Sequence, residues 1–503
     1  MPENASTHRN ADADRTAKAM VGTGRAHVFA GLRSGASVIA LALLFGGGPA
    51  SAESLSQALA SAYRYNPQLD AQRAQLRATD EGVAIANSGY RPNITASADT
   101  SLDYAETRPS SGSNGTVNNR GYSINLTQPL FTGFRTTYGV KVAEANVRSG
   151  REDLRDVERT VLLNAVTAYM DVVRDQAVVR LQENNVNVLS RELKATQDRF
   201  AVGEVTRTDV AQAQARRAGS VSALDLAKAN LKTSRATYER VVGNPPSNLA
   251  DPGPPDNLLP RSLEAALAAG EHENAQIISA LYLEEAARHN VDQIRGELLP
   301  SAQLEASWSE RYDPSPNVEQ AESGVVAGRV TVPIYEGGQV YARVRQAKQL
   351  HVARLQQVEL VRTQVREGVI AAWAQYQAAK AQVQSDRTQV NAAQTALLGV
   401  REEEKVGQRT LLDVLNAEQE QLNAQVQLVT DQRNLVVTGY AVLAAVGRLE
   451  ANRIGAASEV YNPEIHYEEV RRKWWGLSIT HEDGRNERVD LWPGDRREAP
   501  PMK

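Results

Sequence analysis

The sequence predicts a chain in which long α-helices and short β-strand pairs occur twice, so that an α-helical barrel continues into a transmembrane β-barrel. Three observations support this fold class. An ordered series of motifs recurs about two hundred residues later, the long segments carry heptad periodicity, and two alternating segments precede each long helix. Four strands cannot close a barrel, so we expect several copies to close it together; three copies would give twelve strands.

The first 52 residues have the layout of a secretory signal peptide. Basic residues precede an apolar run from Ala36 to Phe45, and Ala50-Ser51-Ala52 provides a small-residue cleavage site. The run is too short for a permanent spanning helix, although a short membrane anchor is the alternative. We therefore expect export and cleavage after Ala52, with translation starting at Met1 or Met20.

Composition excludes several classes of function. The net charge of the 503 residues is only −4, so no bulk field indicates nucleic acid, and the absence of cysteine excludes disulfides, thiolate metal sites and an N-terminal lipid on cysteine. The motifs of metalloproteases, serine hydrolases, phosphate-binding loops and dinucleotide-binding folds are missing, and the seven histidines are scattered. We expect neither an enzyme nor a bound cofactor or metal.

A duplication sets the domain organisation. Gln128–Gly133 recurs as Val332–Gly337, and Val202–Val210 recurs as Val406–Val414, each 204 positions later. A proline-rich stretch joins the two copies and cannot continue a helix. The expected parts, after the signal peptide, are a first repeat (53–243), a linker (244–262), a second repeat (263–447) and a C-terminal part (448–503).

Each repeat has the same order of elements. Apolar and polar residues alternate in the strands, whereas the long helix has no proline and carries two apolar stripes, which indicates neighbours on two sides. In the first repeat we expect a helix over 55–88, a strand over 93–104, a loop over 106–119, a return strand around 122–127, a helix over 135–201 and a helix over 209–242.

The strand pairs point to a membrane. Strands of about 10–12 residues with one apolar and one polar face suit a tilted membrane strand whose polar face lines a water-filled lumen. The segments 106–119 and 313–324, which are polar and rich in turn residues, are the expected external loops. A soluble hairpin that packs its apolar face on a neighbour is the alternative.

These repeats resemble the TolC family of outer-membrane efflux and type I secretion channels. The resemblance covers Leu55 to Leu449 and is strongest in Gln128–Gly133, its second copy, and Val406–Leu415. It implies a homotrimer in the outer membrane, in contact with lipid, with a periplasmic helical tunnel and an equatorial collar that includes part of 448–503, ahead of a disordered tail. It also implies a passive exit duct that docks through a periplasmic adaptor to an inner-membrane pump of the ABC, RND or MFS type.

The turns between the paired helices are the candidate functional sites. Glycine there permits a tight turn, and the resemblance implies that these tips meet the adaptor: Val202, Gly203, Val406 and Gly407. Thr206 and Thr410 each precede an aspartate by three residues, which predicts capping boxes with Asp209 and Asp413.

The resemblance also implies a periplasmic gate at these tips. Arg409 would pair with Asp209 or Thr208 of an adjacent hairpin, and three copies of Asp413 would form a negative ring in the pore. A second acidic residue that the family often carries is replaced by Asn416, which puts the strength of this ring in doubt.

Two other classes of protein remain as rivals. A periplasmic coiled-coil adaptor or structural protein would share the heptads but would not need amphipathic strand pairs before each long helix. A trimeric adhesin would need a passenger region, for which no spare segment exists. The cargo, whether drug, protein or polysaccharide, is not encoded in any motif of the chain.

Overall fold

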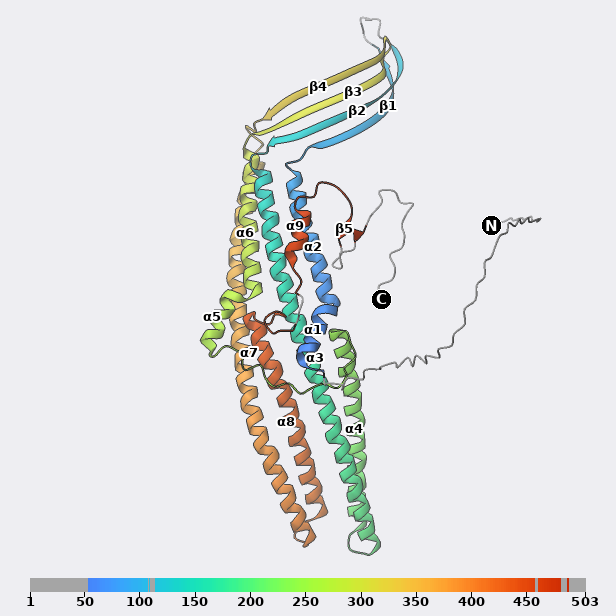
Figure 1. Ribbon diagram of the computed structural model, residues 1–503, viewed down its shortest axis with the longest axis vertical. Helices are drawn as coiled ribbons and strands as arrows, with labels where there is room; N and C mark the ends of the chain where they lie inside the picture. The colour runs from blue at the N-terminus through green and yellow to red at the C-terminus, as the bar shows by residue number, and fades with distance from the viewer. Residues whose placement is uncertain (1–52, 107, 109–113, 457–459, 481–485, 488–503) are drawn as a thin grey trace, which may run out of the picture. The chain divides into compact units, whose positions relative to one another are not determined.

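The computed structural model describes residues 53–106, 108, 114–456, 460–480 and 486–487, all within one compact unit that begins at Ser51. The predicted signal peptide, residues 1–52, lies outside the described residues, as does most of the predicted tail. In that unit a four-stranded sheet lies at one end, long helices run away from it, and two helical hairpins form the opposite end (Figure 1).

The first helix of the first repeat is two helices, which corrects the single helix expected over 55–88. These are α1 (Leu55–Tyr65) and α2 (Pro67–Ser88). Pro67 can begin a helix but cannot continue one, and the Asn66 side chain caps α2 by accepting a hydrogen bond from the backbone N–H of Gln68 at 2.9 Å. Asn274 separates α5 (Leu263–Glu273) from α6 (Ala275–Arg295) in the same way without a proline.

The sheet is antiparallel in the order β1-β2-β3-β4. Its strands are β1 (Asn93–Ala105), β2 (Gly115–Phe131), β3 (Ser301–Ser315) and β4 (Val318–Thr331). They are longer than expected, and most of the loop predicted over 313–324 is paired strand, so that only Pro316 and Asn317 form the turn. Backbone pairing with β4 overrides the turn-forming residues of this segment, and a register shift between Tyr312 and Ser315 absorbs them.

The register of the sheet confirms its two faces. Ile94, Leu126, Ala306 and Val326 lie in one row across the four strands, on the apolar face. The opposite face is polar and internally paired: Arg311 contacts Asp99 at 3.1 Å, Arg329 contacts Glu305 at 2.8 Å, and Ser97 bonds Ser123. The sheet therefore has one apolar and one polar face, as the alternation predicts.

The long helices match the expected bounds. They are α3 (Arg135–Ala201) with α4 (Arg207–Val242) in the first repeat, and α7 (Gln339–Lys405) with α8 (Leu411–Val446) in the second. Near the sheet α3 packs between α2 and α6, and near the tips it packs between α4 and α8, while α7 packs on α6 and α8. None of the described helices combines the length and apolar character of a membrane-spanning segment.

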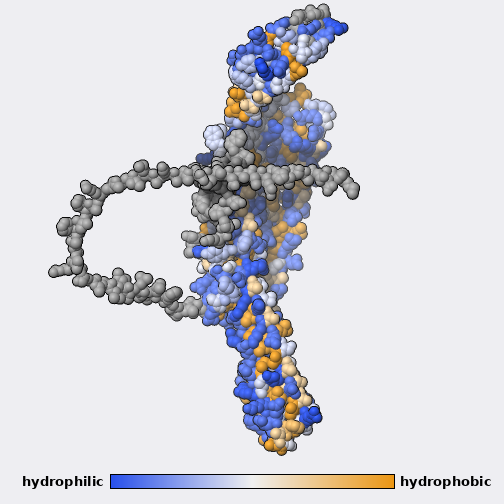
Figure 2. Space-filling model, turned by 90° about the vertical axis from the view of Figure 1, so that its right-hand side faces the viewer, coloured by the Kyte–Doolittle hydropathy of each residue, from blue (hydrophilic) through white to orange (hydrophobic). Residues whose placement is uncertain are grey.

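The main core lies halfway along the helices. Tyr169 and Leu162 of α3 and Tyr238 of α4 are fully buried there, and the Tyr169 hydroxyl donates to the carbonyl of Ala250 at 2.6 Å. Leu449 and Ala451, which follow α8, belong to the same core, and α9 (Pro463–Val470) then packs on α2. Elsewhere the layers are thin, and hydrophobic residues stay exposed along the helices (Figure 2).

Candidate gating and docking sites at the hairpin tips

The two hairpins end in matching turns. Gly203 and Gly407 have φ of 80° and 76°, and a Cβ would meet no atom within 4 Å at either position, so the backbone conformation and not space requires glycine. The neighbouring Val202 and Val406 are 71% and 70% exposed. Each hairpin therefore presents an apolar side chain at its outermost turn, where no described residue covers it.

Both predicted capping boxes are present. The backbone N–H of Thr206 donates to the Asp209 carboxylate at 2.8 Å, and that of Thr410 donates to Asp413 at 3.0 Å. The threonine hydroxyls accept in return from the aspartate N–H groups, both at 3.3 Å. The hydrogen bonds from Thr410 hold the pKa of Asp413 below its usual range. Both aspartates thus fix the start of the returning helix.

Arg409 pairs within its own hairpin. Its Nε lies 2.9 Å from a carboxylate oxygen of Glu403, and this contact raises the pKa of the guanidinium. Among the described residues no contact joins Arg409 to Asp209 or Thr208, and Thr208 is exposed. The expected pair is therefore not formed inside one chain, and a pair between neighbouring subunits stays a prediction.

Sequence reasoning missed the contacts that join the two tips. Arg199 of α3 contacts Glu404 of α7 at 2.8 Å, and Arg216 of α4 donates to Asn416 of α8 at 2.6 Å. Leu189 packs between them on Leu411 and Leu415. No motif near either residue signals these contacts, although the position that holds Arg199 in the first copy holds Glu403, next to its partner, in the second.

Charged groups are also enclosed above the tips. Within the second hairpin, Arg401 of α7 contacts Glu418 of α8, which is only 6% exposed, at 2.6 Å. Burial raises the pKa of the nearby Glu192, and the charges of Glu418 and Glu404 raise it further. Glu192 belongs to α3, so carboxylates of both hairpins lie close together at this height, and separating the hairpins changes their electrostatic surroundings.

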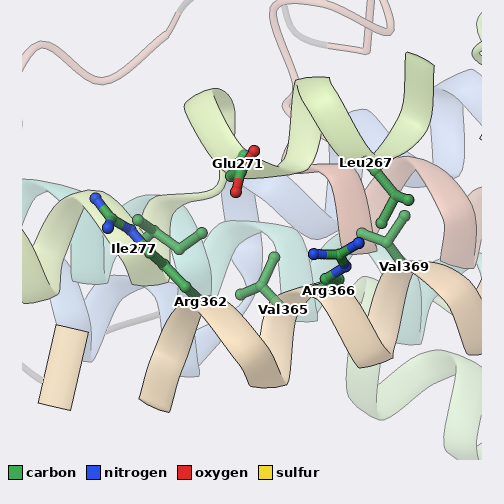
Figure 3. A pocket seen from close by; sticks show the side chains of 7 residues that line it. All are labelled: Leu267, Glu271, Ile277, Arg362, Val365, Arg366 and Val369. Atoms are coloured by element: carbon green, nitrogen blue, oxygen red, sulfur yellow. The ribbon is translucent and has the colours of Figure 1, made fainter. Parts of the chain in front are cut away.

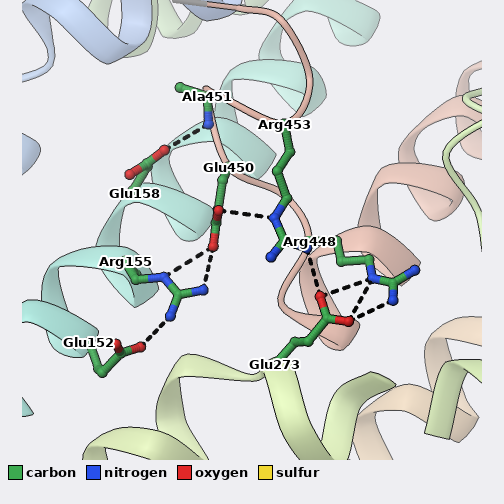
Figure 4. Close-up of polar contacts among 8 residues, drawn as sticks. All are labelled: Glu152, Arg155, Glu158, Glu273, Arg448, Glu450, Ala451 and Arg453. Atoms are coloured by element: carbon green, nitrogen blue, oxygen red, sulfur yellow. Dashed lines mark hydrogen bonds and ion pairs between the residues drawn. The ribbon is translucent and has the colours of Figure 1, made fainter. Parts of the chain in front are cut away.

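A second candidate region lies at mid-height, where ion pairs fasten the segment that follows α8 (Figure 4). Glu450 contacts Arg155 of α3 and also Arg453. Glu273 of α5 contacts Arg448 and Arg453, each at 2.6 Å. The hydrogen bond from Arg448 and the one from Arg453 lower the pKa of Glu273 to about 2. The network ties both repeats to the C-terminal segment.

A groove of about 120 Å³ opens nearby between α5, α6 and α7 (Figure 3). Four of the residues that line it are apolar: Leu267, Ile277, Val365 and Val369. The other three are charged: Glu271, Arg362 and Arg366. Within the described part of the chain, no cluster of histidine, aspartate and glutamate could hold a metal ion. The groove has no constellation of catalytic groups.

The chain is similar in sequence to known outer-membrane proteins. The family model described as outer membrane efflux protein matches residues 56–244 and 270–448. The chain is 40% identical over 459 residues to the outer membrane efflux protein BepC of Brucella suis, covering 90% of this chain and 97% of that protein. It is 26% identical to the outer membrane protein TolC of Escherichia coli, over 82% of this chain and 86% of TolC.

A solved structure shares the fold. The CmeC outer membrane channel of Campylobacter jejuni superposes with a TM-score of 0.71 at 17% identity, covering 83% of this chain and 89% of the channel.

Proposed function

The chain belongs to the outer membrane efflux protein family, and on that premise we propose that three copies form a gated exit duct through the outer membrane. The duct conducts cargo passively from an inner-membrane pump, which reaches it through a periplasmic adaptor. Residence in the Gram-negative outer membrane follows from the family. The observation that carries the proposal is a two-faced sheet in which β1 and β4 each have one edge that pairs with no described strand.

Closure by other copies is the simplest way to satisfy those edges. An unpaired strand edge is not tolerated inside a bilayer, because no water is present to bond the backbone groups. If β4 of one copy pairs with β1 of the next, three copies give a barrel of twelve strands. The polar face, with Arg311–Asp99 and Arg329–Glu305, then lines the lumen, and the apolar face meets lipid.

The helical part supports the same closure. The face of α7 away from α6 and α8 exposes several large apolar side chains, and the opposite edge of the chain exposes Ile85 and Leu226. At the foot of the sheet a Cβ at Gly133 would come within 2.3 Å of the Gly296 carbonyl oxygen, whereas the matching Gly337 has nothing within 4 Å. Both differences are expected if a neighbouring copy completes the second repeat.

The tips supply the gate. In three copies, Arg409 and the Arg199–Glu404 pair would hold the hairpins together at the narrow end, and Asp413 would face the pore. Each exposed ion pair contributes roughly 0–1 kcal/mol, but several pairs act together on one opening equilibrium and bias it by a few kcal/mol. We assign adaptor docking to the exposed Val202 and Val406 with their glycines.

Small molecules are the cargo that we propose. The relative at 40% identity is named an efflux protein, and the charges on the polar face of the sheet are mutually paired, so the barrel presents no strong field of either sign. The rival function, a periplasmic coiled-coil adaptor, does not account for the apolar face of the sheet.

Conductance in planar bilayers tests the proposal. We expect oligomers of wild-type protein to conduct weakly and Arg409→Ser to conduct several-fold more, because the replacement removes the Glu403 contact and any pair across the pore. Arg409→Lys, which keeps the charge, is the matched control and should stay close to wild type. Wild-type conductance for Arg409→Ser would contradict the gate. Intact oligomers that never conduct, in any variant, would contradict the duct.

A further inference from the structure

The segment after α9 carries an unusual exposed apolar cluster. Trp474 and Trp475 are 64% and 88% exposed, and Leu477 and Ile479 are half exposed. Tryptophan is normally well buried, and large apolar side chains gathered on a surface usually meet another surface. Within the described part of the chain, nothing covers this cluster.

The cluster is held at the foot of the sheet. The Arg91 guanidinium donates to the backbone carbonyl of Lys473 at 2.6 Å and lies 4.9 Å from the centre of the Trp474 ring. Asn87, at the end of α2, donates to the carbonyl of Arg471 at 3.2 Å. Since β1 begins at Asn93, these contacts set the two tryptophans beside the start of the sheet. In Figure 1 the chain after α9 arches over at this level.

The helix before the cluster is firmly attached. His466 of α9 lies 2.9 Å from the Asp80 carboxylate of α2, which is fully buried, and Glu464 pairs with Arg151 of α3. Arg151 also stacks over the ring of Tyr467. The exposed cluster is thus presented by an anchored element.

Charge identifies the surface that this cluster fits. Three cations in sequence, Arg471, Arg472 and Lys473, precede the tryptophans. Arg471 pairs with Glu468, whereas Arg472 is exposed and forms no ion pair with a described residue. Cations beside exposed tryptophans favour the boundary between anionic headgroups and acyl chains, where indole rings concentrate. A further aromatic pair, Tyr122 and Trp308 with rings 5.5 Å apart, lies about halfway along β2 and β3.

We propose that residues 471–479 form an interfacial hook that inserts Trp474 and Trp475 into the periplasm-facing leaflet of the outer membrane, with Arg472 at the phospholipid headgroups. The inference rests on the proposed placement of the sheet in the bilayer. The chain has no cysteine that could carry a lipid, so the hook supplies a peripheral contact with the membrane outside the barrel.

Tryptophan quenching by brominated phospholipids tests the hook in the full-length oligomer. The chain has five tryptophans, and replacement of Trp308, Trp373 and Trp492 by phenylalanine leaves only the pair in the hook. In liposomes with bromine near the headgroup end of the acyl chains, we expect this variant to lose most of its emission. One control keeps only Trp308, on the sheet, and should also be quenched. The other keeps only Trp373, on α7, and should not.

The controls separate the possible failures. If Trp308 is quenched and the hook pair is not, the hook is refuted while the inserted sheet stands. If Trp308 also escapes quenching in intact oligomers, the proposed function fails. A hook pair that is protected from aqueous acrylamide in detergent-solubilised oligomers, and unaffected by brominated lipid, would show that a second copy covers the cluster and would overturn the proposal.

Discussion

The long helices α3 and α7 have the same length, 67 residues, and opposite surroundings. Along α3, all of which is described, Phe200 is the only large hydrophobic residue that is exposed, whereas α7 exposes seven: Tyr341, Leu350, Val352, Leu355, Leu360, Ile370 and Leu398. The reason is position, because α3 lies between neighbours on both sides and α7 is at the edge of the chain. Its own chain therefore buries, at least in part, the large apolar residues of α3 other than Phe200, whereas it leaves many of those on α7 exposed.

Matching positions show how the sequence adapts to this difference. Leu355 of α7 corresponds to Arg151 of α3, and Arg151 pairs with Glu464 of the C-terminal segment. Arg366, exposed at the rim of the groove, corresponds to Leu162, which is fully buried. In the first repeat, the C-terminal segment and neighbouring helices contact α3, and the matching positions hold ion-paired or core residues. In the second repeat, α7 has fewer such neighbours among the described elements, and the matching positions hold exposed apolar residues or charges at the groove.

A carboxylate on the exposed face of α7 should have the largest effect. If a second copy covers this face, Leu355→Glu encloses an unpaired charge at a cost on the order of 3–5 kcal/mol, and the oligomer should be lost. Leu355→Met, which keeps the size, is the matched control. Mass measurement in detergent checks the result, and a Leu355→Glu variant that remains oligomeric would place this face in solvent.

The contact of the C-terminal segment with the first repeat predicts a smaller loss of stability, which the matching substitution in the second repeat should not cause. Glu158 accepts a hydrogen bond from the backbone N–H of Ala451 at 2.7 Å, so Glu158→Ala leaves a buried donor without a partner, at about 1–3 kcal/mol. The matching Arg362→Ala, at the open groove, should change stability by no more than about 0.5 kcal/mol. Thermal unfolding of both variants checks the contrast, and equal losses would refute it.

The capping boxes should show no difference between the repeats. Thr206→Ala and Thr410→Ala each remove one cap, at about 1 kcal/mol, because the two boxes have nearly identical geometry. Faster hydrogen exchange in the first turns of α4 and α8 would report both losses. Protection that falls at one tip only would mean that the other tip is held by further contacts.

The smallest predicted effect is a dependence of stability on pH in the ion-pair network around Glu273. The pKa of Glu273 is about 2, below its ordinary value of 4.5, so its contribution to stability is complete above pH 4.5 and is lost as pH falls toward 2. The melting temperature of Glu273→Gln should therefore lie below that of wild type at pH 6 and approach it below pH 4.5. A constant gap across this range would contradict the assignment.

Much of this arrangement follows from local sequence. The bounds of α3 were predictable because no proline interrupts the helix and glycines flank it, and the capping boxes because Thr206 and Asp209 are three residues apart. The break at Asn66 was missed because the apolar periodicity continues across it. The second external loop was predicted too long because Pro314 and Pro316 favour turns. Only Pro316 lies in the turn, whereas most of the predicted loop pairs as strand.

The pairs between the tips were beyond local reasoning. Arg199 and Glu404 are 205 positions apart, and nothing in either neighbourhood indicates that the hairpins meet at this height. Contacts of that kind depend on how the two repeats pack, which motifs and periodicity do not determine.

Cross-linking between strand edges tests most directly whether three copies complete the duct. The chain has no cysteine, so Ala96→Cys on β1 and Val326→Cys on β4 introduce the only thiols. A flexible bismaleimide should convert the double variant into covalent dimers and trimers, with nothing larger, and should leave each single variant monomeric on a denaturing gel. Cross-linked dimers of a single variant, or ladders beyond three copies, would contradict closure of β4 on β1 in a ring of three.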